Sequence, residues 1–286
     1  MHPIVKGSLT AAGAAVALVC VSATIVWLKS EAVIIDRYPL PSTTAVASTE
    51  AKYIRRGAHL VAIAGCADCH GENLEGRAVV RDGILAVSST NLRRAAHALS
   101  DDDFERAIRA GIAPDSTSMW IMPSMDYAYM SEDDVAAIVS YLRTFPADGA
   151  AAPGAQFDMQ VRYGIANGDI EPIAVRVPDA SASLDLGPRY DGGRYLARLA
   201  CADCHGTDLA GSRTAPDLTV VGLYSRAEFF ALLHAGRTHD GRQSPAMSRP
   251  RFRALYDYET DALYDYLYAR ANALKRTEVA AGESRQ

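Results

Sequence analysis

The sequence Cys-Ala-Asp-Cys-His occurs twice in this chain, and no other feature limits its fold as strongly. The first copy spans residues 66–70 and the second spans residues 201–205. The eleven residues that start at each first cysteine, CADCHGENLEG and CADCHGTDLAG, agree at eight positions. Internal similarity of this kind indicates that one structural unit is present twice.

The similarity continues beyond the motif at a constant spacing. Four features recur 125 positions later: Phe104 and Phe229, Ala110-Gly111 and Ala235-Gly236, Met122 and Met247, and Tyr141-Leu142 and Tyr266-Leu267. The two motifs themselves are 135 positions apart. The second copy therefore lacks ten residues between its motif and its methionine.

A histidine that directly follows Cys-x-x-Cys indicates covalent haem attachment. Each thiol adds to one vinyl group of the haem, and the histidine becomes the proximal ligand of the iron. We therefore expect two covalently bound haem c groups. Their attachment residues are Cys66, Cys69 and His70 in the first copy and Cys201, Cys204 and His205 in the second. A zinc site or a reactive dithiol also uses Cys-x-x-Cys, but neither explains a histidine after both pairs.

The sixth ligand of each iron decides between electron transfer and catalysis, and methionine favours electron transfer because it raises the potential and closes the site. Met247 is the only methionine after His205, and the repeat aligns it with Met122. We predict the axial pairs His70 with Met122 and His205 with Met247. Met119 and Met125 remain alternatives in the first copy.

The second copy departs from the first directly after its methionine. Pro123 follows Met122, whereas Ser248 follows Met247. Proline restricts the backbone and suits a rigid ligand loop. A weaker or exchangeable ligand therefore remains open for the second haem.

The N-terminal region contains an apolar segment at residues 7–28, which has no charged residue and is flanked by Lys6 and Lys29. This length is enough to span a bilayer, whereas a cleaved secretory signal has a shorter apolar region. We expect an uncleaved transmembrane anchor, with a signal cleaved after Ala23 as the alternative. Both interpretations export the rest of the chain. Cys20 lies inside this segment and is interpreted as a small apolar side chain.

The remaining patterns predict a mainly α fold. Ser100, Ser131 and Ser225 stand where helices are expected to begin, and Gly111 and Gly236 where two of them end. No alternating strand pattern of useful length is present. The predicted organisation is an anchor at 1–30, a spacer at 31–50, a first domain at 51–147, a connector at 148–187, a second domain at 188–272 and a polar tail at 273–286.

The charge pattern argues against a nucleic-acid partner. The chain has 29 Lys and Arg residues, 34 Asp and Glu residues and a net charge of -5. The basic residues are scattered and form no block that could follow a phosphate backbone.

Taken together, these motifs resemble the cytochrome c family, and specifically the membrane-anchored dihaem c-type cytochromes of bacterial respiratory chains. The resemblance rests on GCADCHG at 65–71, Asn91-Leu92, MPS at 122–124 and MSEDDVAAIVSYLRTFP at 130–146. It implies a transmembrane helix followed by two tandem class-I cytochrome c-like domains that face the periplasm. It also implies histidine–methionine ligation of both irons.

The expected function is therefore single-electron transfer, with no catalytic residues of the chain's own. Similar chains serve as cytochrome subunits of membrane-linked dehydrogenases, so the expected partners are a dehydrogenase, an oxidase or another cytochrome. Two other functions remain open. One is a haem enzyme, such as a dihaem peroxidase or a sulfur-oxidising cytochrome, which needs an exchangeable sixth ligand. The other is an assembly subunit that retains its haems for folding.

Overall fold

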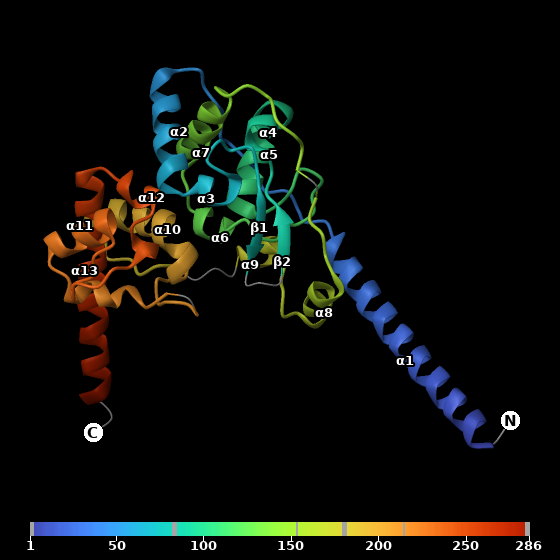
Figure 1. Cartoon of the computed structure of the whole chain (residues 1–286). Coiled ribbons are helices and arrows are strands. Elements are labelled where there is room, and N and C mark those ends of the chain that lie inside the picture. The colour runs from blue at the N-terminus through green and yellow to red at the C-terminus, as the bar shows by residue number, and fades with distance from the viewer. Residues whose placement is uncertain (1–2, 82–84, 153, 179–181, 214, 284–286) are drawn as a thin grey trace.

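The structure, a computed structural model, describes residues 3–81, 85–152, 154–178, 182–213 and 215–283. It is mainly helical, as predicted. A long N-terminal helix, α1 (Pro3–Ile34), projects from one side, and the rest of the chain forms two neighbouring helical halves. Figure 1 shows the first half in blue and green and the second half in orange and red.

The first half is built around the crossing of its first and last helices. Its elements are α2 (Ala51–Ile63), α3 (Cys66–His70), α4 (Leu92–Ala98), α5 (Asp101–Glu105) with the π-helical turn η1 (Arg106–Ala110), α6 (Ser124–Tyr127) and α7 (Glu132–Leu142). Gly57 of α2 lies directly on α7, so that a Cβ atom at this position would be 1.9 Å from the backbone oxygen of Ala137. Only glycine permits such a close approach between two helix backbones.

The second half repeats this crossing. Its elements are η2 (Pro188–Tyr190), α10 (Asp191–His205), η3 (Leu218–Leu223), α11 (Arg226–Ala235), η4 (Pro245–Met247), α12 (Pro250–Arg253) and α13 (Asp257–Glu283). A Cβ atom at Gly193 of α10 would be 2.1 Å from the backbone oxygen of Ala262 in α13. The internal repeat of the sequence is therefore a repeat of tertiary packing.

Two helices begin at the serine caps that the sequence predicts. The Ser100 side chain accepts from the Asp103 backbone, and the Asp103 carboxylate accepts from the Ser100 backbone in return. Ser225 and Glu228 form the same reciprocal pair at the start of α11. The helices that follow end at Gly111 and Gly236, both in the left-handed region, as predicted.

Two short strands, which the sequence pattern did not predict, interrupt the helical fold. β1 (Ala78–Arg81) pairs with β2 (Leu85–Ser88) as an antiparallel hairpin, in register Ala78 with Ser88. Strands of four residues are too short for a periodic pattern to stand out. The hairpin lies between Gly76 and Asn91, a stretch much longer than the corresponding Gly211–Asp217 in the second half.

The predicted connector at 148–187 has secondary structure of its own. It contains α8 (Met159–Asn167) and α9 (Ile173–Arg176). Ile173 is buried, and its backbone N–H donates to the Met119 oxygen at 3.1 Å. The connector is thus packed on the first half.

The predicted spacer and polar tail are described in part. The spacer binds the first half, since the backbone N–H groups of Thr44 and Ala45 both donate to Glu105 Oε2 at 2.8 Å. At the other end of the chain, α13 continues through Glu283, so the predicted tail at 273–286 is helical over its described part.

The N-terminal helix is attached to the connector by Arg162 of α8. Its guanidinium lies 3.5 Å from the ring centre of Trp27 and donates to Ser30 Oγ at 3.0 Å and Glu31 Oε2 at 2.8 Å. Within α1, residues Gly13–Ile34 are long and apolar enough to cross a membrane by length and composition. This criterion does not separate an anchor from a signal sequence.

Candidate haem sites

The two motif histidines are held in the same way. His70 Nδ1 lies 2.8 Å from the backbone oxygen of Thr90, and His205 Nδ1 lies 2.7 Å from the backbone oxygen of Pro216. A carbonyl can only accept, so Nδ1 carries the proton in both rings. Nε2 is then the nitrogen with a lone pair for iron, which is the usual way in which a second residue orients a ligating histidine. Burial lowers the pKa of both imidazoles, which favours the neutral form that binds metals.

The first cysteine of each motif is shielded from water, since Cys201 is buried and Cys66 is half-buried. Burial raises the pKa of Cys66 to about 12 and that of Cys201 to about 12. A reactive dithiol needs a lowered thiol pKa, so these environments argue against that alternative. Among the described residues, no three His, Cys, Asp or Glu side chains gather into one cluster. Paired thiols beside an oriented imidazole do fit covalent haem c.

A loop of shared conformation follows each motif. Gly76 N–H donates to the His70 oxygen at 2.7 Å, and Gly211 N–H donates to the His205 oxygen at 2.8 Å. Leu74 and Leu209 have φ of 60° and 64°, in the left-handed region that leucine rarely adopts. Both leucines are buried, so side-chain packing offsets the backbone cost. The same strained turn in both copies indicates that each loop has the same task.

A serine that sequence reasoning missed supports each motif. Ser89 Oγ donates to the Cys69 oxygen at 2.7 Å, and Ser212 Oγ donates to the Cys204 oxygen at 2.6 Å. The two serines are not at either repeat spacing, because they lie in the stretch whose length differs between the copies. No sequence signal marks them.

Residues 54–146 match the sequence model of the cytochrome c family. The chain contains a cytochrome c domain. It is also similar to the fructose dehydrogenase cytochrome subunit of Gluconobacter japonicus, with 27% identity over 269 residues. That alignment covers 79% of this chain and 54% of the relative, so the chain spans about half the length of the curated relative it matches. The cytochrome is thus related to dehydrogenase cytochrome subunits.

The matched range contains the whole first motif and ends within the first half. The described structure of the second half can be compared with that of the first. Motif, oriented histidine, left-handed leucine and glycine crossing all recur there. These are similarities between the two halves of this chain and not similarities to another protein.

The predicted methionine ligands lie in equivalent places. Met122 precedes α6 in a loop, and Met247 ends η4. Both are half-buried against the same core cluster. Met119 and Met125 are half-buried as well, so burial does not distinguish the candidates of the first half. Ligation by Met122 and Met247 stays a prediction.

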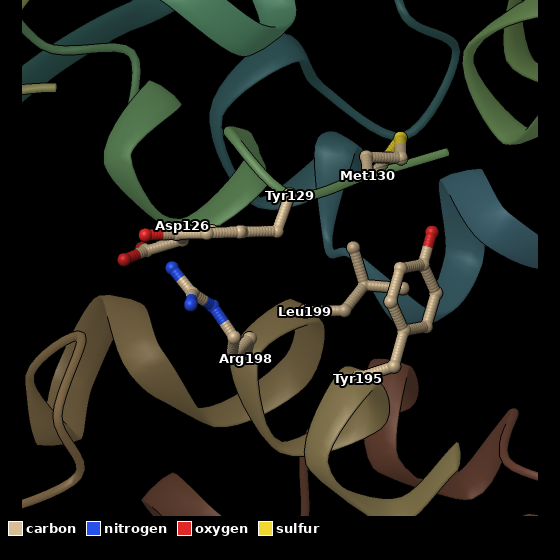
Figure 2. Close-up of a pocket in the computed structure, with 6 residues that line it drawn as sticks. All are labelled: Asp126, Tyr129, Met130, Tyr195, Arg198 and Leu199. Atoms are coloured by element: carbon tan, nitrogen blue, oxygen red, sulfur yellow. The ribbon is translucent and has the colours of Figure 1, made fainter. Parts of the chain in front are cut away.

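The two halves of the cytochrome meet along the face that carries the motifs. Figure 2 shows Arg198 of α10 beside Tyr129 and Asp126 of the first half. The Arg198 guanidinium lies 3.4 Å from the centre of the Tyr129 ring, and the side chain is buried. Tyr195 and Leu199 of the same helix face Met130 across a small pocket. Aromatic, apolar and charged contacts therefore join α10 to the first half.

Proposed function

We propose that this cytochrome holds two haem c groups in two tandem class-I cytochrome c-like domains, 51–147 and 188–272, and carries single electrons between redox proteins. One observation carries the proposal. Each half presents a motif histidine whose Nδ1 is held by a backbone carbonyl. When bound, haem supplies an iron that alternates between two oxidation states. The chain's own residues attach it, orient its proximal ligand and exclude water.

The proposed axial pairs are His70 with Met122 and His205 with Met247. We expect Met122→Ala and Met247→Ala each to lower one haem potential, because a thioether ligand favours ferrous iron. The fall is expected to be on the order of 0.1 V, a fraction of the roughly 0.8 V range that axial ligands cover. Spectroelectrochemical titration of the reduced and oxidised forms measures both potentials.

Met130→Leu is the matched control for this experiment. Met130 is buried in the core near Tyr127, so its replacement by a similar apolar side chain leaves both potentials unchanged. If Met122→Ala moves neither potential, Met119→Ala and Met125→Ala identify the ligand instead. A high-spin haem in the wild type, or a spectral shift with dilute cyanide or peroxide, contradicts the electron-carrier function and favours a haem enzyme.

The proposed location is the bacterial inner membrane, with both haem domains in the periplasm. The apolar α1 supports it, as does the contact of Arg162 with Trp27, which fixes the end of α1 to the folded part. The expected result is a chain of full-length mass that stays in the membrane fraction after a carbonate wash. A mature chain that begins at Thr24 and leaves the membrane would show a cleaved signal.

The proposed partner is a membrane-linked dehydrogenase that donates electrons to the cytochrome. The support is the relative, whose name assigns it to fructose dehydrogenase. Affinity capture of the detergent-solubilised full chain, followed by peptide identification, tests this proposal. Recovery of an oxidase or another cytochrome in place of a dehydrogenase would assign a different partner.

A further inference from the structure

One buried arginine, Arg251 of α12, lies between the two attachment motifs. Its Nη1 is 3.3 Å from Asp68 Oδ2 in the first motif, and its Nη2 donates to the Ala200 backbone oxygen at 3.1 Å. Ala200 directly precedes Cys201. The residue is 6% exposed. Figure 1 shows α12 next to both α3 and α10, the helices that carry the motifs.

The first motif is shaped to receive this guanidinium. A Cβ atom at Gly65 would lie 2.9 Å from the Arg251 Cζ and Nη1 atoms. Gly65 directly precedes Cys66 and has φ of 71°, a second reason for glycine there. Arg251 therefore packs on the backbone just before the first cysteine of one motif and hydrogen-bonds just before the first cysteine of the other.

The charge of Arg251 acts on both motifs. It opposes the effect of burial on the pKa of the Cys66 thiol and of the Cys201 thiol, so its field reaches both sites. Arg251 pairs with Asp68, which also lies 3.6 Å from Arg249. Because Arg251 is buried, water screens its charge poorly, and the charge interacts over longer distances than an exposed one.

Other contacts join the two halves without Arg251. Tyr195 Oη donates to Asp134 Oδ2 at 2.5 Å, and His59 Nε2 lies 2.9 Å from both carboxylate oxygens of Glu259. Asp134 is also paired with Arg56 of its own half at 2.8 Å. A substitution at Arg251 therefore leaves the two halves in contact, and its effect on the motifs can be measured separately.

We propose that Arg251 is a positioning residue for electron transfer between the two haems, holding both attachment motifs together and placing one positive charge beside both motifs. The inference rests on the proposed two-haem function. In the step, one electron leaves the ferrous iron of one haem, which becomes ferric, and reduces the ferric iron of the other. No bond forms or breaks. A fixed cation stabilises the reduced state of each haem, so both potentials rise.

The test uses the full-length, haem-loaded protein in detergent. Arg251→Met removes the charge and keeps the length of the side chain. We expect both reduction equilibria to fall at least threefold, which is about 28 mV at 59 mV per tenfold change. Arg251→Lys keeps the charge and is expected to retain most of both potentials. Arg226→Met, which breaks exposed ion pairs with Asp261 and Asp265 in the same half, is the control and should change neither.

Circular dichroism in the Soret band tests positioning separately from charge. Two close haems give a bisignate signal that depends on their mutual geometry, and we expect Arg251→Lys to weaken it while Arg226→Met does not. If Arg251→Met binds no haem, Asp68→Asn replaces it. This variant frees one end of the bridge and is expected to raise the potential of the first haem and weaken the signal.

Two results overturn the inference. One is that Arg251→Met leaves either potential unchanged. The other is an unaltered Soret signal in both Arg251→Lys and Asp68→Asn. The failure of the proposed function looks different, because the wild-type chain would then carry one haem. If the wild type carries two haems and the Arg251→Met substitution changes neither potential, only the proposed role of the arginine is overturned.

Discussion

Full-length protein with the double substitution Cys66→Ser and Cys69→Ser is expected to carry one covalent haem instead of the two proposed for the wild type. The physical reason is that a serine hydroxyl does not form the thioether bond with a haem vinyl group. His70 would remain, but an imidazole alone does not retain haem through denaturation. Haem staining after denaturing electrophoresis, with haem quantified per mole of chain, measures the loss.

The second motif provides the matched experiment. Cys201→Ser with Cys204→Ser should also leave one haem, and all four substitutions together should leave none. Cys20→Ser is the control, since Cys20 lies in α1, away from both motifs. If the second pair of substitutions leaves the haem content unchanged, the second half is not a haem domain and the two-haem function is wrong.

The second large effect is expected at the glycine crossings. Gly57→Ala places a methyl group against the Ala137 backbone oxygen, and Gly193→Ala does the same against Ala262. Backbone atoms cannot rotate away, so each helix pair must move apart. Overpacking of this kind costs about 3 kcal/mol. Thermal unfolding followed by circular dichroism should show each melting temperature lowered by roughly 6–12 °C.

The adjacent Gly192 is a control within the same helix. A Cβ atom at Gly192 meets nothing within 4 Å. Gly192→Ala should therefore raise the free energy of unfolding by about 0.5–1 kcal/mol, because alanine favours helix. Equal melting temperatures for Gly192→Ala and Gly193→Ala would show that α10 and α13 do not cross in the way described.

Local signals in the sequence predicted much of the helical framework. The reciprocal caps at Ser100 and Ser225 and the glycine stops at Gly111 and Gly236 depend on residues within one or two turns, so short patterns identify them. The sequence patterns did not predict the β-hairpin, α8 or α9, because no local signal specifies them. Their stability comes from contacts with distant residues, such as the bond between Ile173 and Met119, which local patterns do not record.

The candidate sites divide in the same way. The motif by itself selects the cysteines and histidines proposed to hold haem, because the attachment chemistry acts within five consecutive residues. The partners of those residues are distant or irregular in sequence: the Thr90 and Pro216 carbonyls, Ser89 and Ser212. Every residue has a backbone carbonyl, so no sequence pattern shows which carbonyl accepts from a motif histidine.

By itself, the sequence determined the chemistry of this cytochrome: two attachment motifs, two aligned methionines and an apolar N-terminal segment. Only the tertiary structure decided how the two motifs are placed, because Arg251 is 183 residues from Asp68 and reaches it only when the two halves pack together. The physical reason is the distance along the chain over which each property is decided. Covalent attachment depends on neighbours along the chain, whereas the electric field and separation of two sites depend on neighbours in space.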